Sequence, residues 1–198
     1  MLKVLLLRHA RTQSNARKAY LGLTNEPISA EGAAFAAGLH YDSERKVYVS
    51  PMKRAVQTAE ICLPNAERVI VPEFREMDFG VFEGRSAADM SGDTEFTAWT
   101  EQNCEPAPPG GSESWTEYRD MVCCKFDRLV TEHLSRGDNR IAIVAHGGTI
   151  MAIMSRYAQP EKPYYMWNPR HRSGYELLVD TASNGDWKLE SWESLKTE

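Results

Sequence analysis

The chain has 198 residues, with 23 Lys and Arg against 28 Asp and Glu, a formal charge of −5, and 42% hydrophobic residues. These proportions are typical of a globular protein and exclude a disordered chain, which has fewer apolar residues and more net charge. The acidic total argues against a broad nucleic-acid-binding surface. The apolar run at the N-terminus stops at Arg8. It is too short for a signal-peptide core or a membrane span, so we expect neither nucleic-acid nor membrane partners.

The four cysteines, Cys62, Cys104, Cys123 and Cys124, include no Cys-x-x-Cys pair. Adjacent cysteines are poorly suited to a shared metal site or a disulfide framework. Free thiols in a reducing compartment are therefore predicted, with a cytoplasmic location.

Strand and helix patterns alternate along the chain. In order, they predict a strand at 3–7, a helix at 29–39, a strand at 46–49, a helix from Pro51 to about 63, a strand at 68–71, loops with one short helix over 77–111, a helix from 114 to about 134, a strand at 141–145, a helix at 149–157 and strands at 175–180 and 187–191. The apolar runs are typical of strands buried on both faces. The helices begin at capping patterns: Ser29, Ser50 before Pro51, and the capping box of Ser114 and Glu117.

This alternation predicts an α/β fold, a three-layer α/β/α sandwich around a mostly parallel sheet. The last two strands, joined at Asn184 and Gly185, predict an antiparallel hairpin at one edge of the sheet. The length favours a single domain covering residues 1–198.

Reactive side chains follow three of the predicted strands. Arg8 and His9 follow the first strand, Arg54 lies in the first helical turn after the second, and His146 follows the strand at 141–145. Ligands of open α/β sheets bind beyond the carboxyl ends of the strands, so we expect these four side chains to converge there. Gly147 and the glycine after it open a helix, where backbone N–H groups favour an anion.

Such a group of residues is suited to phosphoryl chemistry. Guanidinium groups match phosphate oxygens, one histidine can attack phosphorus, and the other can donate to an equatorial oxygen. An acid is needed for the leaving oxygen, and Glu76, after the third strand, is the leading candidate. Taken singly, each of these residues is more often structural or solvated. A metal held by His9 and His146 is the rival interpretation, but it lacks a third ligand.

Five segments resemble, in the same order, the motifs of the histidine phosphatase superfamily, in its phosphoglycerate-mutase-like branch. They are residues 7–15 (LRHARTQSN), 50–59 (SPMKRAVQTA), 75–84 (REMDFGVFEG), 110–114 (GGSES) and 144–148 (VAHGG). Any one segment is weak evidence, but five in the family's order are specific. The motifs reach from Leu7 to Gly148, and the whole chain is compatible with one such domain.

The resemblance implies a role for each matching residue. His9 would become phosphohistidine, and Glu76 would protonate the leaving oxygen and then help to activate water. Arg8, Arg54 and His146 would form the phosphate pocket, assisted by Asn15 and the backbone of Gly147. These five residues, His9, Glu76, Arg8, Arg54 and His146, are the predicted catalytic set, and neither a metal nor another cofactor is required.

Two positions depart from the family's motif. Ala10 replaces the usual glycine after the nucleophile, and a methyl group there needs space and a compatible backbone angle. Arg11 replaces the more common Glu or Gln, which adds a positive charge near the mouth of the pocket. Neither change touches the five predicted catalytic residues.

The segment that begins at Glu76 looks most similar to alpha-ribazole phosphatases and to broad-specificity phosphatases. Residues 77–111 would form a lid-like insertion whose aromatics, Phe82, Phe96 and Trp99, can stack on a substrate or simply pack the lid. The lid is short, so hydrolysis of a small phosphate monoester, for example alpha-ribazole 5′-phosphate, is favoured. Phosphoglycerate mutase activity is the alternative, followed by a phospholigand-binding module without turnover. A homodimer stays open, because Trp187 and Trp192 can line an interface or pack internally.

Overall fold

The computed structural model describes residues 1–41, 45–169, 173–182 and 186–195, and its centre is one six-stranded sheet in the order β3-β2-β4-β1-β5-β6. The strands are β1 (Leu2–Arg8), β2 (Lys46–Val49), β3 (Glu67–Ile70), β4 (Arg140–Ala145), β5 (Gly174–Thr181) and β6 (Trp187–Ser194). β1, β2, β3 and β4 run parallel, and β5 and β6 add the antiparallel edge. The predicted sheet is therefore confirmed, whereas the turn at 184–185 lies outside the described residues.

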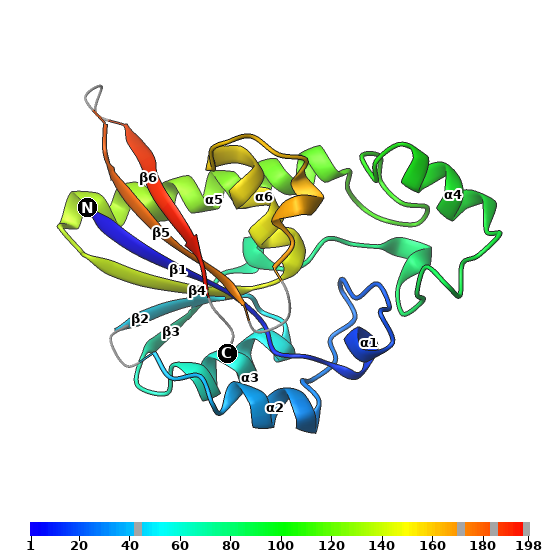
Figure 1. Ribbon diagram of the computed structural model, residues 1–198, viewed down its shortest axis with the longest axis horizontal. Helices are drawn as coiled ribbons and strands as arrows, with labels where there is room; N and C mark the ends of the chain where they lie inside the picture. The colour runs from blue at the N-terminus through cyan, green and yellow to red at the C-terminus, as the bar shows by residue number, and fades with distance from the viewer. Residues whose placement is uncertain (42–44, 170–172, 183–185, 196–198) are drawn as a thin grey trace.

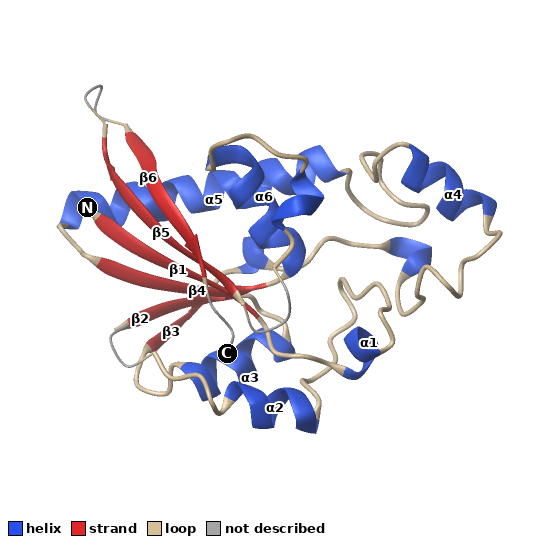
Figure 2. Cartoon of the chain, in the orientation of Figure 1, coloured by secondary structure: helices blue, strands red, loops and turns tan. Residues whose placement is uncertain are grey.

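Helices cover both faces of this sheet, as Figures 1 and 2 show. They are α1 (Gln13–Ala16), α2 (Ala30–Ala36), α3 (Lys53–Cys62), α4 (Thr94–Glu101), α5 (Trp115–Arg136) and α6 (Gly147–Tyr157), with short 3₁₀ turns η1 (Pro72–Phe74), η2 (Gly80–Phe82) and η3 (Tyr164–Trp167). α2 and α3 lie on one face, and α5 and α6 lie on the other. This arrangement confirms the three-layer α/β/α sandwich.

Alternation along the strands produces two separate cores. Leu5 and Leu7 of β1 point into the core under α2 and α3, whereas Val4 and Leu6 point into the larger core under α5 and α6. Successive strand residues face opposite sides of a sheet, so an almost continuous apolar strand serves both layers. Within the described ranges, no helix combines the length and the apolar character needed to cross a bilayer.

The helix ends follow the capping chemistry expected from the sequence at two places and differ at a third. Ser29 caps α2, and Ser114 forms a capping box with Glu117 at the start of α5. The helix predicted to begin at Pro51 begins instead at Lys53, with no side-chain cap. The Ser50 hydroxyl was assigned to that cap, but it is used in the polar cluster described below.

A third apolar cluster lies outside the two sheet cores. Phe82, Met90, Phe96 and Trp99 bury one another within the segment between η2 and α4. Figure 1 places α4 away from the sheet, on the side toward which β1 runs. Phe82 and Phe96 are thus lid-core residues, and Trp99 alone of the three predicted aromatics also lines the cavity described below.

Candidate active site

The parallel strands β1, β2 and β4 bring the predicted cationic and imidazole groups to one edge of the sheet. Arg8 is the last residue of β1, and His146 is the N-cap of α6 directly after β4. The ring centroids of His9 and His146 are 5.1 Å apart, and Arg54 Nε lies 3.3 Å from His146 Nδ1. The convergence expected from the strand ends is therefore present.

The His9 ring has a defined tautomer. Its Nδ1 lies 2.7 Å from the carbonyl oxygen of Ala10, and because a carbonyl can only accept, Nδ1 carries the proton. In the neutral form of the ring, the lone pair is therefore on Nε2, the atom that a nucleophilic histidine uses. The Ala10 N–H donates to Thr58 Oγ1 at 2.8 Å, which fixes the backbone that orients the ring. The Ala10 side chain, which stands where the family usually has glycine, is buried, and the hydrogen bond from its N–H to Thr58 is still made.

His146 is held as a neutral ring behind His9. Arg54 Nε donates to Nδ1, so Nε2 carries the proton and donates to Ser50 Oγ at 2.6 Å. Burial lowers the pKa of His146 well below its usual value, and the charges of Arg54, His9 and Arg8 lower it further. Both ring nitrogens are engaged, so donation to a phosphate would require one of these hydrogen bonds to be exchanged. Sequence reasoning missed this use of Ser50, although its motif contains the residue.

Arg54 is fully buried and donates hydrogen bonds to the loop of residues 21–24. Its Nη atoms donate to the carbonyl oxygens of Leu21 (3.3 Å), Gly22 (2.7 Å) and Thr24 (2.8 Å). Burial lowers the pKa of this guanidinium, while the nearby carboxylates of Glu76 and Glu83 oppose that shift. A buried charge needs such partners, and here backbone dipoles supply most of them.

Glu83 also binds this loop, which consists of residues 21–24. The Glu83 carboxylate accepts from Gly22 N (2.8 Å), Leu23 N (2.9 Å) and Thr24 Oγ1 (2.8 Å). A Cβ on Gly22 would meet the Met77 carbonyl oxygen at 2.0 Å, so only glycine fits here. Residues 21–24 therefore connect the lid segment to Arg54.

Arg8 is oriented by the segment after η3. Its Nη1 donates to Asn168 Oδ1 at 3.0 Å and to the Pro169 carbonyl at 2.7 Å, whereas its buried Nε has no hydrogen-bond partner among the described residues. Burial lowers the pKa of Arg8 to about 10, opposed by Glu76 and reinforced by Arg54. The group still carries its charge at neutral pH.

Glu76 is buried and hydrogen-bonded through both carboxyl oxygens. Oε1 accepts from Met77 N at 3.0 Å, and Oε2 accepts from Gly148 N at 3.1 Å. Burial raises the pKa of Glu76, although these two backbone donors and the charges of Arg54 and Arg8 act in the opposite direction. A carboxyl with a raised pKa retains a protonated fraction closer to neutrality and can act as an acid.

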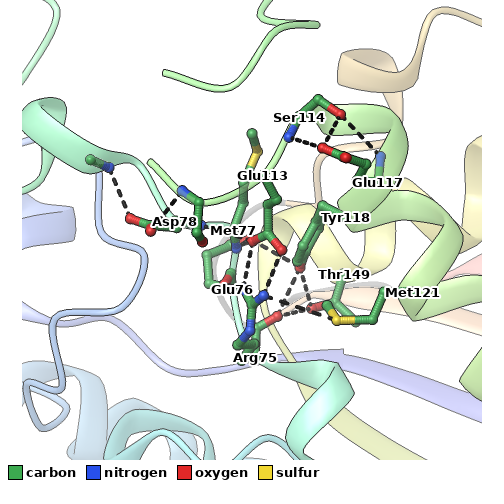
Figure 3. Close-up of polar contacts among 12 residues, drawn as sticks. Arg75, Glu76, Met77, Asp78, Glu113, Ser114, Glu117, Tyr118, Met121 and Thr149 are labelled. Atoms are coloured by element: carbon green, nitrogen blue, oxygen red, sulfur yellow. Dashed lines mark hydrogen bonds and ion pairs between the residues drawn. The ribbon is translucent and has the colours of Figure 1, made fainter. Parts of the chain in front are cut away.

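A second layer of polar groups supports Glu76, as Figure 3 shows. The Tyr118 hydroxyl lies 2.9 Å from the Arg75 carbonyl oxygen, 3.3 Å from Glu76 Oε1 and 3.0 Å from Thr149 Oγ1. Arg75 is itself held by both carboxyl oxygens of Glu113, at 2.6 and 2.5 Å. Bidentate pairs of this kind fix geometry strongly. Neither Tyr118 nor Thr149 carried a sequence signal.

The glycine pair serves close approach as well as helix entry. A Cβ on Gly148 would meet Glu76 Oε1 at 2.1 Å, and one on Gly147 would meet Asn168 Oδ1 at 3.1 Å. The Gly148 N–H, predicted to be open to an anion, is taken by Glu76 instead. The N–H of Gly147, at the first position of α6, has no acceptor within the helix and stays suited to an anion.

These groups meet at a cavity of about 320 Å³. Of the predicted residues, it is lined by Arg8, His9, Asn15, Glu76 and Gly147. Arg54 and His146 are not among its lining residues and form the layer directly behind it. Arg11, predicted near the mouth, also does not line the cavity and lies 3.7 Å from Glu31 of α2. Asn15 has a capping role too, since its Oδ1 accepts from Thr12 N at 3.2 Å.

The remaining predictions concern metals, thiols and tryptophans. Among the described residues, no group of three or more His, Cys, Asp and Glu side chains is arranged to hold a metal ion. The four cysteines are unpaired, in agreement with the sequence. Trp192 packs edge-on against Trp167, and Trp187 packs against Phe126, so both use their own chain as partner.

Comparisons with known proteins agree with this geometry. The sequence model of the histidine phosphatase superfamily (branch 1) matches residues 4–194. The fructose-2,6-bisphosphatase TIGAR B of Danio rerio is 33% identical over 65% of this chain and 54% of its own length, so the chain spans about half of that relative. The adenosylcobalamin/alpha-ribazole phosphatase of Escherichia coli is 28% identical over 90% of both proteins. The crystal structure of the alpha-ribazole phosphatase from Shigella flexneri superposes with a TM-score of 0.76 at 26% identity, covering 96% of this chain and 95% of that one.

Proposed function

The chain belongs to branch 1 of the histidine phosphatase superfamily and is a phosphatase of this type, and we propose that it hydrolyses small phosphate monoesters through phosphohistidine at His9. One observation carries the proposal: His9, whose Nδ1 donates to the Ala10 carbonyl, and Glu76, a buried carboxyl with a raised pKa, line the same cavity. A nucleophile and an acid are the two groups that transfer to histidine requires.

The proposed first step transfers the phosphoryl group. His9 Nε2 attacks phosphorus while the bond from phosphorus to the ester oxygen breaks, and protonated Glu76 gives its proton to that oxygen. In the second step a water molecule attacks the phosphohistidine, Glu76 takes a proton from it, and the bond from phosphorus to Nε2 breaks. The products are the alcohol and inorganic phosphate, and both His9 and Glu76 return to their starting state.

The phosphate oxygens have donors close to His9. Arg8, Asn15 and Gly147 line the same cavity as His9, and they offer a guanidinium, a side-chain amide and a backbone N–H as donors. Arg54 and His146 are proposed to join when phosphate enters. Arg54 Nε then donates to a phosphate oxygen instead of to His146, and His146 takes the other neutral tautomer, in which Nδ1 donates to the phosphate and Nε2 accepts from the Ser50 hydroxyl. Their positive and neutral states suit this role, since a neutral His146 does not add repulsion to the arginines.

Residues 77–111 are proposed to form a lid within a single domain of residues 1–198. Its apolar cluster and its link through Glu83 to the loop of residues 21–24 support this division. Alpha-ribazole 5′-phosphate is the first specific substrate to test, supported by the names of two similar proteins. We also propose a cytoplasmic location, supported by the unpaired cysteines. The homodimer is a prediction from the sequence.

A panel of phosphate esters tests the activity. The purified chain is incubated with 4-nitrophenyl phosphate, alpha-ribazole 5′-phosphate, sugar phosphates, nucleotides and 3-phosphoglycerate, and the products are analysed for free phosphate and for isomerised ester. We expect free phosphate. Isomerisation of 3-phosphoglycerate without comparable phosphate release would favour a mutase. Binding without either product would favour a phospholigand-binding module, for which a nucleophile and an acid are unnecessary.

A further inference from the structure

Beyond the phosphate end, the cavity wall is made largely of aromatic rings. Six rings from separate parts of the chain line it: Tyr20, Phe79, Trp99, Trp115, Tyr164 and Tyr165. Met151 adds a further apolar surface. Because Arg8, His9, Glu76 and these rings line one cavity, an ester whose phosphate sits at His9 places its alcohol part among the rings.

The rings form two groups held in fixed mutual orientations. In the first, Tyr20 makes edge contacts with Phe79 and Trp99, with centroids 5.1 and 5.8 Å apart. In the second, Tyr164 stacks on Trp115 at 4.2 Å and 27°, and Tyr165 meets Tyr164 edge-on at 5.7 Å. Rings that are already oriented lose little entropy when they bind a ligand.

The polar atoms of two of these rings are satisfied within the protein. Trp99 Nε1 donates to the Pro106 carbonyl at 2.8 Å, and Tyr164 Oη donates to the Asn103 carbonyl at 2.9 Å. These rings therefore offer a ligand hydrocarbon and π surface rather than hydrogen bonds. Packing of the lid alone does not account for the second group, because Tyr165 is 59% exposed and Tyr164 is only half-buried.

We infer that this wall is a specificity site for a planar aromatic ring in the alcohol part of the ester. The inference rests on the proposed function and names the substrate class: phosphate monoesters whose alcohol part carries an aromatic or heteroaromatic ring. Aromatic pairs prefer offset or edge-to-face contacts, which a saturated ring of the same skeleton cannot reproduce. Tyr164 and Tyr165 are the specificity-determining residues most open to the ligand.

Two matched esters test the inference. 2-Phenylethyl phosphate and 2-cyclohexylethyl phosphate share a carbon skeleton and a primary alkoxide leaving group, so the chemical step at Glu76 is equivalent for both. We expect the aromatic ester to have a kcat/KM about tenfold higher in the wild-type chain. 2,2,2-Trifluoroethyl phosphate, which has no ring and a better leaving group than either ester, reports the basal activity in the same preparations.

Variants then locate the preference. Tyr165→Leu and Tyr164→Leu should each lower the ratio of the two kcat/KM values by about threefold, since each removes one ring from the wall. Tyr41→Leu is the matched control, because Tyr41 packs against the core under α2 and α3 and does not line the cavity. A loss of folded protein lowers both rates equally and leaves the ratio unchanged, so the ratio separates recognition from stability.

Each outcome has a distinct meaning. Equal kcat/KM values for the two esters in the wild type, or a ratio unaffected by both tyrosine variants, overturn the ring site while the phosphatase activity stands. Absence of phosphate release from all three esters overturns the proposed function itself. A ratio near ten that falls in the Tyr164 and Tyr165 variants and persists in Tyr41→Leu supports the ring site.

Discussion

The two ends of the cavity are built in different ways. At the phosphate end, Arg8, His9 and His146 are placed by neighbouring parallel strands, and hydrogen bonds hold their side chains. At the aromatic end, Tyr20, Trp99 and Tyr164 come from loops and short elements and are held mainly by contacts between rings. Directional hydrogen bonds fix atoms where charge moves, whereas ring packing fixes a shape. We therefore expect chemistry to depend on the first end and substrate choice on the second.

Loss of the nucleophile should have the largest effect. His9→Ala removes the only atom assigned to attack phosphorus, so kcat should fall by about 10⁴-fold or more for every ester, whatever its alcohol. Phosphate release measured for good and poor leaving groups checks this. His40→Ala, at an exposed histidine, is the matched control. Retention of a tenth of the wild-type rate in His9→Ala would contradict the assignment.

Removal of the acid should depend on the leaving group. Glu76→Gln should lower kcat by about 10²–10³-fold for alkyl esters, which need a proton, and much less for 4-nitrophenyl phosphate. Glu73→Gln, three residues earlier, is the control. Equal losses for both kinds of ester would count against Glu76 as the acid.

The pH dependence follows from the same carboxyl. Burial raises the pKa of Glu76, and the first step needs the protonated form. The rate for alkyl esters that are limited by this step should therefore fall as the pH rises through that raised pKa, and the fall should be absent in Glu76→Gln. A pH profile of kcat for an alkyl ester measures this. An alkaline limb that is unchanged in the variant would show that another group titrates.

Weakening the contact between Glu83 of the lid and the loop that holds Arg54 should lower kcat/KM by an intermediate amount. Glu83→Gln removes the charge and leaves one carbonyl oxygen for the donors of Gly22, Leu23 and Thr24, so the loop should hold Arg54 less firmly. We expect about a tenfold loss in kcat/KM and weaker inhibition by inorganic phosphate, since each lost charge-assisted hydrogen bond counts for roughly this much. Glu60→Gln, exposed on α3, is the control. Unchanged phosphate inhibition would leave Glu83 with a purely structural role.

Weakening the lid without touching the phosphate end should have the smallest effect on chemistry. Asp93 caps α4 by accepting from the backbone N–H groups of Glu95 and Phe96, so Asp93→Ala should destabilise this helix by about 1 kcal/mol. Amide exchange in α4 should quicken by about fivefold, with α6 unchanged and kcat for 4-nitrophenyl phosphate within twofold. Asp120→Ala, exposed on α5, is the control. Equal acceleration in α4 and α6 would mean that the two ends open together.

Much of the fold was predictable because its signals are local. The apolar runs of β1 and β4 and the capping box at Ser114 specify strands and a helix through short-range patterns. The start of α3 was predicted two residues too early. The Ser50 hydroxyl accepts from Met52 N, before the helix begins, and it also contacts His146, 96 residues away. A residue that can cap a helix can also serve a distant partner, and local propensity does not rank the two.

The residues at the phosphate end were determined by the sequence alone, because parallel strands must deliver whatever follows them to one edge of the sheet. Only the tertiary structure decided how those residues are engaged. It placed Arg54 and His146 behind the cavity, committed the Gly148 N–H to Glu76, and raised the pKa of that carboxyl by burial. It also assembled the aromatic wall, in which Tyr20 and Tyr164 are 144 residues apart in the chain. Contacts between rings follow no regular spacing along the sequence. Rings so far apart in the chain therefore meet only when the layers of the fold pack together.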